Sequence, residues 1–167
     1  MVCMMGRGRG GYTEKQIWYL DSGGKKVRDR GAISVAEFYM DMGYECVFRK
    51  EHPPGKSYDL TIKSSDDSLY IKNIEVKQVA SPSISQFAKN IARAFKQLPD
   101  YSNCVAALYL KNFKNNEIGL KFAQAGFDEA VRKGYVKGKV EVWFSDKTRI
   151  FMTQTSQFLN YLTHCFI

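Results

Sequence analysis

The chain has 167 residues, enough to bury one hydrophobic core without disulfide or metal cross-links. Its 44% hydrophobic and 25% charged residues are ordinary for a soluble globular protein. The 25 Lys and Arg residues outnumber 17 Asp and Glu residues, which gives a net charge of +8. This excess favours a polyanionic partner such as nucleic acid or an acidic protein.

Cysteine spacing and hydropathy exclude several other classes. The four cysteines are far apart and form no C-x-x-C pair, so we expect reduced thiols in a cytosol and no zinc site. The longest strongly apolar run, residues 104–110, is too short to span a bilayer, so no membrane anchor is expected. The first nine residues lack the long apolar core of a signal peptide, so any delivery would depend on machinery outside this sequence.

The N-terminal region differs in composition from the remainder. Residues 1 to about 32 are glycine-rich and basic, which predicts a partly ordered arm that residues 17–20 anchor to a single domain over 33–167. Ser34 with Glu37 three residues later has the spacing of a capping box and predicts the start of a helix that ends at Gly43.

The hydrophobic periodicity predicts a series of strands and helices, a polar hairpin loop at 64–68 and a last helix from about Thr155. We expect strands over residues 45–49, 57–63, 69–79, 104–110, 139–144 and 149–152, and helices over 34–42, 83–98 and 117–133. The 104–110 strand is apolar throughout, which is typical of a strand buried on both faces.

Two adjacent strands carry charges where a sheet interior is usually apolar. Glu75 and Lys77 lie two residues apart and therefore share one face of their strand. If the 57–63 strand pairs antiparallel with the 69–79 strand, Asp59 lies near Glu75. Two close carboxylates repel each other unless a cation binds between them, so this pattern indicates a divalent-metal site. The other interpretation is an exposed ion-pair face with no function.

This arrangement resembles the PD-(D/E)XK nuclease superfamily over roughly residues 33–112. The resemblance implies an α/β fold with an αβββαβ restriction-endonuclease-like core and a mixed central sheet, here followed by an extra helix and strands. It implies that Asp59 and Glu75 bind Mg²⁺ or Mn²⁺, that Lys77 positions the attacking water, and that Glu37 completes the site from the first helix. The proline of the family name is absent, because Tyr58 precedes Asp59.

The helix over 83–98, which residues 80–83 are expected to cap, follows the motif directly and is basic. Gln86, Lys89, Asn90 and Arg93 share one face at helical spacing, and we expect this face to contact the phosphates of nucleic acid. A solvated helix face is the alternative interpretation. The sequence does not distinguish DNA from tRNA, because phosphate contacts are generic.

The size, charge and glycine-rich start further resemble the C-terminal toxin domains of contact-dependent growth inhibition and other polymorphic toxins. That resemblance implies a nuclease that acts in the cytoplasm of a target cell, after delivery as part of a larger secreted protein, and an acidic immunity protein that neutralises it. Two alternatives stay open. One is a basic module that binds nucleic acid without cleaving it, and the other is a metal-independent RNase that uses His52, Tyr58 and Lys56.

Overall fold

The computed structural model describes residues 3–5, 17–50, 58–64, 71–99 and 103–152. A short ribbon of β1 (Cys3–Met5) and β2 (Ile17–Tyr19) precedes the main domain. The main domain consists, in chain order, of α1 (Arg30–Asp41), β3 (Tyr44–Phe48), β4 (Leu60–Ser64), β5 (Ile71–Val79), α2 (Ile84–Gln97), β6 (Cys104–Leu110), α3 (Glu117–Arg132), β7 (Lys139–Phe144) and β8 (Arg149–Met152).

The six strands β3 to β8 form one mixed sheet in sequence order. The β3–β4, β4–β5 and β7–β8 pairs are antiparallel, whereas β5–β6 and β6–β7 are parallel. Parallel neighbours need a crossover connection, which α2 and α3 provide. The order α1-β3-β4-β5-α2-β6 confirms the predicted αβββαβ core, and α3, β7 and β8 are the predicted C-terminal additions.

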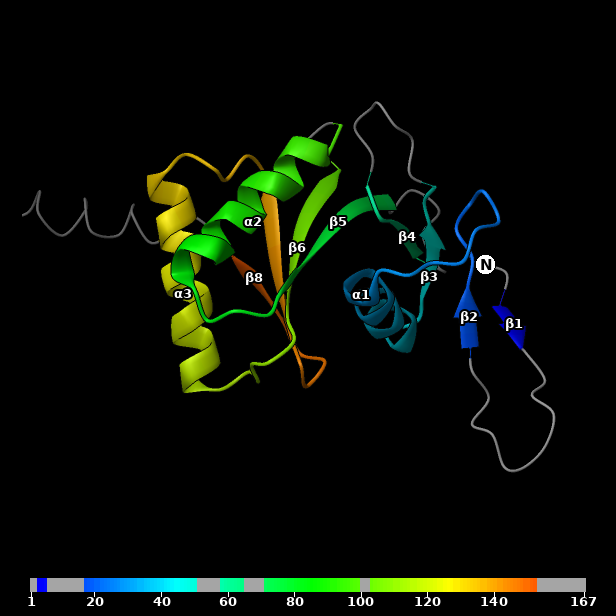
Figure 1. The fold of residues 1–167 in the computed structure, drawn as a ribbon, viewed down its shortest axis with the longest axis horizontal. Helices are drawn as coiled ribbons and strands as arrows, with labels where there is room; N and C mark the ends of the chain where they lie inside the picture. The colour runs from blue at the N-terminus through cyan, green and yellow to red at the C-terminus, as the bar shows by residue number, and fades with distance from the viewer. Residues whose placement is uncertain (1–2, 6–16, 51–57, 65–70, 100–102, 153–167) are drawn as a thin grey trace, which may run out of the picture.

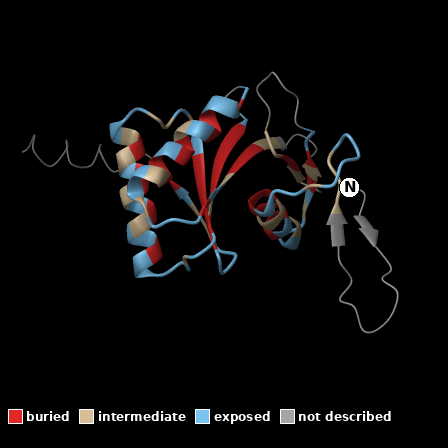
Figure 2. Cartoon of the chain, viewed as in Figure 1, coloured by how far each residue is buried: buried red, intermediate tan, exposed pale blue. Residues whose placement is uncertain are grey.

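Helices cover both faces of the sheet (Figure 1). The α2 and α3 helices pack on one face, in a core that includes Phe87, Ile91 and Phe127. The α1 helix packs on the other face, in a core that includes Tyr39 and Trp143. The β6 strand is buried on both sides, as its apolar sequence predicts, and Figure 2 shows buried residues along the central strands and the inward sides of the helices.

The α1 helix begins four residues before the predicted N-cap. Asp29 is the N-cap and accepts a hydrogen bond from the Ala32 N–H, so the prediction of Ser34 as N-cap is wrong. Ser34 lies inside the helix, where its hydroxyl donates to the Arg30 carbonyl. Gly31, in the first turn, packs closely on β5, because a Cβ there would lie 3.2 Å from Cβ of Gln78.

The α2 helix begins at its predicted cap and packs closely on α3. Ser83 accepts a hydrogen bond from the Gln86 N–H, which satisfies one free donor of the first turn. Gly126 of α3 faces Phe87 of α2, and a Cβ at Gly126 would lie 2.4 Å from the Phe87 ring. The missing side chain therefore sets how closely the two helices approach.

Some predictions fall outside the described residues. These are the turn at residues 53–55, most of the 64–68 loop, the helix from Thr155, and the side chains of His52 and Lys56. In the part of the chain that the structure describes, none of the helices has the length and apolar character needed to cross a membrane.

Candidate active site

Asp59 and Glu75 lie opposite each other where β4 and β5 meet. Leu60 pairs with Ile74, so the antiparallel register places the preceding residue, Asp59, across from Glu75. Directly opposed side chains have their Cβ atoms about 4.5–5.5 Å apart on one face. The Asp59 N–H donates to the Ile74 carbonyl at 3.0 Å, and its carboxylate Oδ2 accepts from the Val76 N–H at 2.8 Å. The backbone of β5 thus holds the Asp59 side chain in place.

Glu75 is almost fully buried, with 2% of its surface exposed. Lys77, two residues further along β5, points the same way and donates from Nζ to Oε1 of Glu75. The Lys77 side chain keeps 24% of its surface exposed, so the contact lies at the boundary between the sheet and solvent. The structure therefore brings together Asp59, Glu75 and Lys77, as the strand pattern predicts.

The two carboxyl groups are difficult to ionise together. Burial and the neighbouring charge of Asp59 raise the pKa of Glu75 to about 8, against the opposing effect of Lys77. Burial also raises the pKa of Asp59, although the Val76 N–H and Lys77 oppose the rise. Without a bound cation, the pair therefore retains a proton on Glu75 at neutral pH. A carboxyl pKa that is raised by burial and by a neighbouring like charge is characteristic of functional sites.

The donor set suits a hard divalent cation. Oδ2 of Asp59 accepts from the Val76 N–H and Oε1 of Glu75 accepts from Lys77, and the two carboxyl groups also share a hydrogen bond with each other. A cation bound between them would replace the proton of that shared hydrogen bond. Mg²⁺ is commonly bound by one or two carboxylates and keeps water or substrate phosphate as its other ligands. Among the residues that the structure describes, no three His, Cys, Asp or Glu side chains converge as a ligand group. The residues thus fit a cation that shares its coordination with water or substrate.

The acidic residues of α1 contribute differently from the prediction. Glu37 is exposed and accepts a hydrogen bond from the Tyr19 hydroxyl at 3.2 Å. It lies about 12 Å along the helix axis from the N-cap Asp29, at 1.5 Å per residue. Asp29 is the α1 residue whose charge raises the pKa of Asp59. Asp29 was not among the predicted site residues, because the predicted helix began after it.

The predicted binding face of α2 is only partly exposed. Lys89 and Arg93 are exposed, whereas Gln86 is half-buried and Asn90 keeps 6% of its surface exposed. Gln86 donates from Nε2 to Oδ1 of Asn90 at 3.2 Å, so these two amides bind each other. The positive charge of this face therefore comes from Lys89 and Arg93, with Lys96 beyond them.

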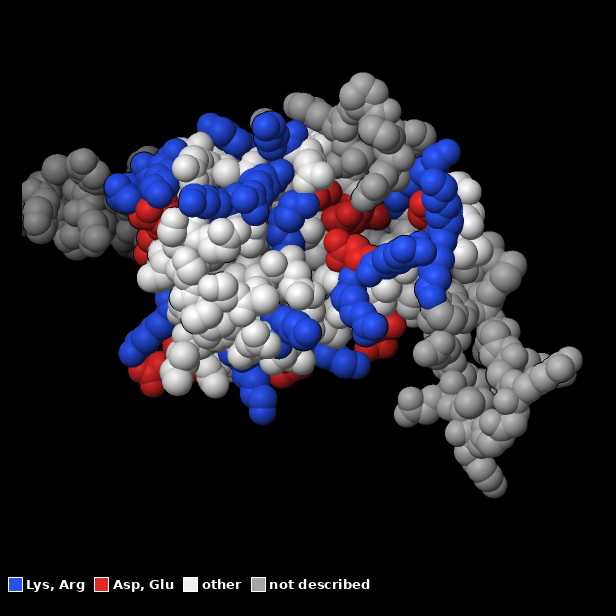
Figure 3. All heavy atoms as spheres, in the orientation of Figure 1, with Lys and Arg blue, Asp and Glu red and all other residues white. Residues whose placement is uncertain are grey.

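A cavity of about 690 Å³ adjoins the carboxylate pair. Asp59 itself lines it, together with segments that the sequence did not connect with the site: Asp21, Lys25, Lys26, Val27, Arg28, Asp29, Ala32, Phe48, Arg49 and Lys50. Figure 3 shows acidic side chains on this face between groups of basic ones. The basic composition of residues 1–32 was the only sequence signal for this cavity.

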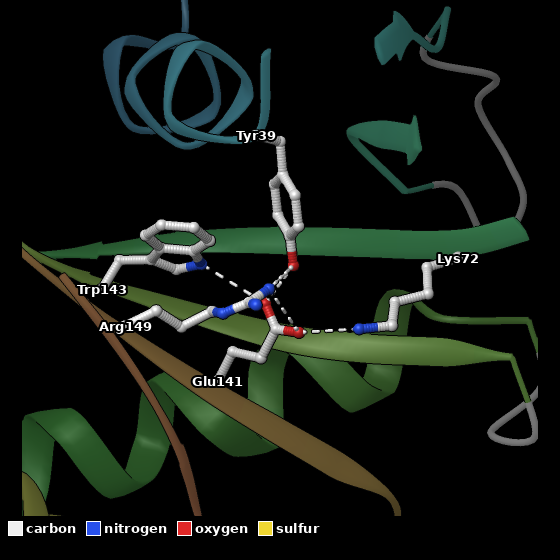
Figure 4. Close-up of polar contacts among 5 residues, drawn as sticks. All are labelled: Tyr39, Lys72, Glu141, Trp143 and Arg149. Carbon is white, nitrogen blue, oxygen red and sulfur yellow. Dashed lines mark hydrogen bonds and ion pairs between the residues drawn. The ribbon is translucent and has the colours of Figure 1, made fainter. Parts of the chain in front are cut away.

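A second polar cluster lies on the α1 face of the sheet, around the fully buried Glu141 (Figure 4). Tyr39 and Trp143 donate hydrogen bonds to its carboxylate, and Lys72 approaches it at 3.1 Å. Arg149 lies 3.7 Å from the carboxylate and donates to the Tyr39 hydroxyl at 3.1 Å. These contacts join α1 to the sheet. Because the described partners surround the Glu141 carboxylate, the cluster offers no open ligand position among the described residues.

No protein-family model and no curated protein matches the chain. Among solved structures, SfsA from Pyrococcus furiosus, determined in complex with Ca²⁺, aligns with a TM-score of 0.28 and 16% sequence identity. The alignment covers 89% of this chain and 73% of that one.

Proposed function

We propose that this domain is a metal-dependent nuclease that hydrolyses phosphodiester bonds in nucleic acid. The observation that carries the proposal is the pair of Asp59 and the buried Glu75 with Lys77 beside it, at the edge of a basic cavity. An exposed ion-pair face would not need a buried carboxylate whose pKa is raised to about 8. The paired carboxylates suit a cation, and the basic side chains around them suit a polyanion.

Each residue has a specific role in this proposal. Asp59 and Glu75 would hold Mg²⁺ or Mn²⁺, which when bound lowers the pKa of water and neutralises charge on the phosphate. Lys77, held against Glu75, would orient the attacking water and stabilise the negative charge that develops on the phosphoryl oxygens. Lys89 and Arg93 of α2 would contact the phosphate backbone. The contribution of Glu37 stays a prediction.

The test is a cleavage assay with purified protein, plasmid DNA and total tRNA, each with Mg²⁺, Mn²⁺ or EDTA. We expect cleavage with metal, none with EDTA, and loss of cleavage in Asp59→Ala, Glu75→Ala and Lys77→Ala. Glu117→Gln, which neutralises an exposed carboxylate on α3, is the control and should cleave normally. If the wild type binds both nucleic acids and cleaves neither, the domain is a binding module.

The resemblance to polymorphic toxin domains extends the proposal to a partner. A nuclease that attacks generic phosphodiesters harms the cell that makes it, and an acidic immunity protein covering the basic cavity and α2 would prevent this. Complementary charge would make that association fast and sensitive to salt. Expression of the domain alone in a bacterial cytosol tests this extension. Normal growth of cells that produce an actively cleaving domain would contradict it.

A further inference from the structure

Residues 20–29 form a loop, here called the strap, that is fixed to the main domain. Leu20 and Lys26 pair as an isolated antiparallel bridge within it. The Ser22 N–H donates to the Phe48 carbonyl at 2.9 Å, and the Ser22 hydroxyl accepts from the Lys50 N–H at 3.0 Å. Asp29 then caps α1. The strap is thus a positioned wall of the cavity, held by the end of β3 on one side and by α1 on the other.

The strap and the end of β3 carry positive charge that the described residues do not neutralise. Lys25, Arg28, Arg49 and Lys50 are exposed, and within the described part of the chain none of them forms an ion pair with a carboxylate. The acidic neighbours have other partners. Oδ1 of Asp21 accepts from two strap N–H groups, at 2.8 and 2.9 Å, and Oδ1 of Asp29 accepts from Ala32.

The cavity is continuous with the candidate active site. The Arg49 N–H donates to the Asp59 carbonyl at 2.9 Å, and the Arg49 guanidinium lies 5.7 Å from the centre of the Tyr58 ring. Val27, Ala32 and Phe48 supply an apolar part of the lining. The walls therefore present positive charge beside apolar surface, next to a carboxylate that would take part in cleavage. A nucleotide, with its phosphate and its less polar sugar and base, matches this combination.

We infer that the strap cavity binds an unpaired nucleic-acid strand next to the phosphate that is cleaved. This inference rests on the proposed function and assigns its substrate class. A volume of about 690 Å³ is typical of small-molecule sites and admits a few nucleotide units of one strand, but not a base-paired helix. Lys25, Arg28, Arg49 and Lys50 contact the phosphates on the strap side, and Lys89 and Arg93 contact them on the α2 side. The strand continues from the strap cavity past Asp59, which lines the cavity.

The test measures binding of the full chain to a short fluorescent single-stranded oligonucleotide, as DNA and as RNA, by anisotropy over a range of salt concentrations in EDTA. We expect Lys25→Ala/Arg28→Ala to weaken binding at least tenfold and to reduce the slope of log affinity against log salt by about 1.4, at roughly 0.7 per lost contact with a single strand. The control is Lys137→Ala/Lys139→Ala, which removes the same charge from exposed positions at the start of β7 and should bind like the wild type.

Equal losses in the two double variants would overturn the inference, because overall charge would then account for binding. Stronger competition by a duplex than by a single strand of the same sequence would also overturn it. Cleavage by the wild type with metal is measured in parallel on the same oligonucleotide and on its duplex. If the wild type does not cleave but Lys25→Ala/Arg28→Ala still weakens binding, the nuclease proposal alone is rejected. If the wild type cleaves normally but Lys25→Ala/Arg28→Ala binds like the wild type, the strap inference alone is rejected.

Discussion

Replacing Glu75 with glutamine should stabilise the metal-free protein at alkaline pH and should remove its response to metal. Glutamine has nearly the same shape as glutamate but cannot ionise beside Asp59. In the wild type, the unfolded chain loses its Glu75 proton near the ordinary pKa of 4.5, whereas the folded protein keeps it up to about pH 8. The protonated pair therefore favours folding at low pH, and this contribution is lost as the pH rises from 4.5 to 8.

The size of the effect follows from the pKa shift. A rise from 4.5 to about 8 corresponds to an upper limit of about 5 kcal/mol, at roughly 1.4 kcal/mol per pKa unit. We expect about 2–3 kcal/mol, because the protein relaxes and water approaches when the pair ionises. For a domain of this size, that difference raises the Tm of Glu75→Gln above that of the wild type by roughly 5–10 °C above pH 8. The two proteins should have similar Tm values below pH 4.5.

Thermal unfolding followed by circular dichroism between about pH 4 and pH 9, with EDTA or with excess Mn²⁺, tests this reasoning. Metal should stabilise the wild type and not Glu75→Gln, since binding to the folded state adds to stability. Because the metal must displace one proton, its affinity should fall about tenfold per pH unit below pH 8. Glu117→Gln, at an exposed carboxylate, should show neither effect. A Tm difference that does not change with pH, or equal metal responses, would refute the account of the pair.

Three further substitutions test separate parts of the structure. Lys77→Ala should lower the cleavage rate on the order of 100-fold or more with an unchanged circular dichroism spectrum, because Lys77 lies at the solvent boundary and, in the proposed mechanism, acts on the reacting groups. A normal rate would remove it from the site. Glu141→Gln should lower the free energy of unfolding in urea by about 2–4 kcal/mol, because Lys72 and Arg149 lose their buried counter-charge. A loss below about 0.5 kcal/mol, which is typical of a surface substitution, would contradict this. Gly126→Ala should lower the free energy of unfolding by about 1–3 kcal/mol in the same assay, because the alanine Cβ would meet the Phe87 ring. An unchanged stability would mean that α2 and α3 separate freely.

Local sequence patterns were sufficient for most of the core. The apolar run 104–110 and the strands 139–144 and 149–152 have the predicted bounds, because their apolar residues and their flanking turn residues act locally. Ser83 caps α2 as predicted for the same reason. The proximity of Asp59 and Glu75 was also predictable, because an antiparallel hairpin brings residues on its two strands together over a short stretch of chain.

Long-range packing decided the features that the sequence did not show. Asp29 and Ser34 are equally good N-caps by residue type, and in the folded chain Asp29 is the cap and the turn after it packs on β5 at Gly31. Glu141 has the residue spacing of an ordinary strand charge, but its partners Tyr39 and Lys72 come from distant parts of the chain. The strap cavity likewise joins residues before α1 to the end of β3 through backbone contacts. Hydrophobic periodicity determines which residues are buried within each element, whereas the polar groups that meet across the sheet depend on how all the elements pack.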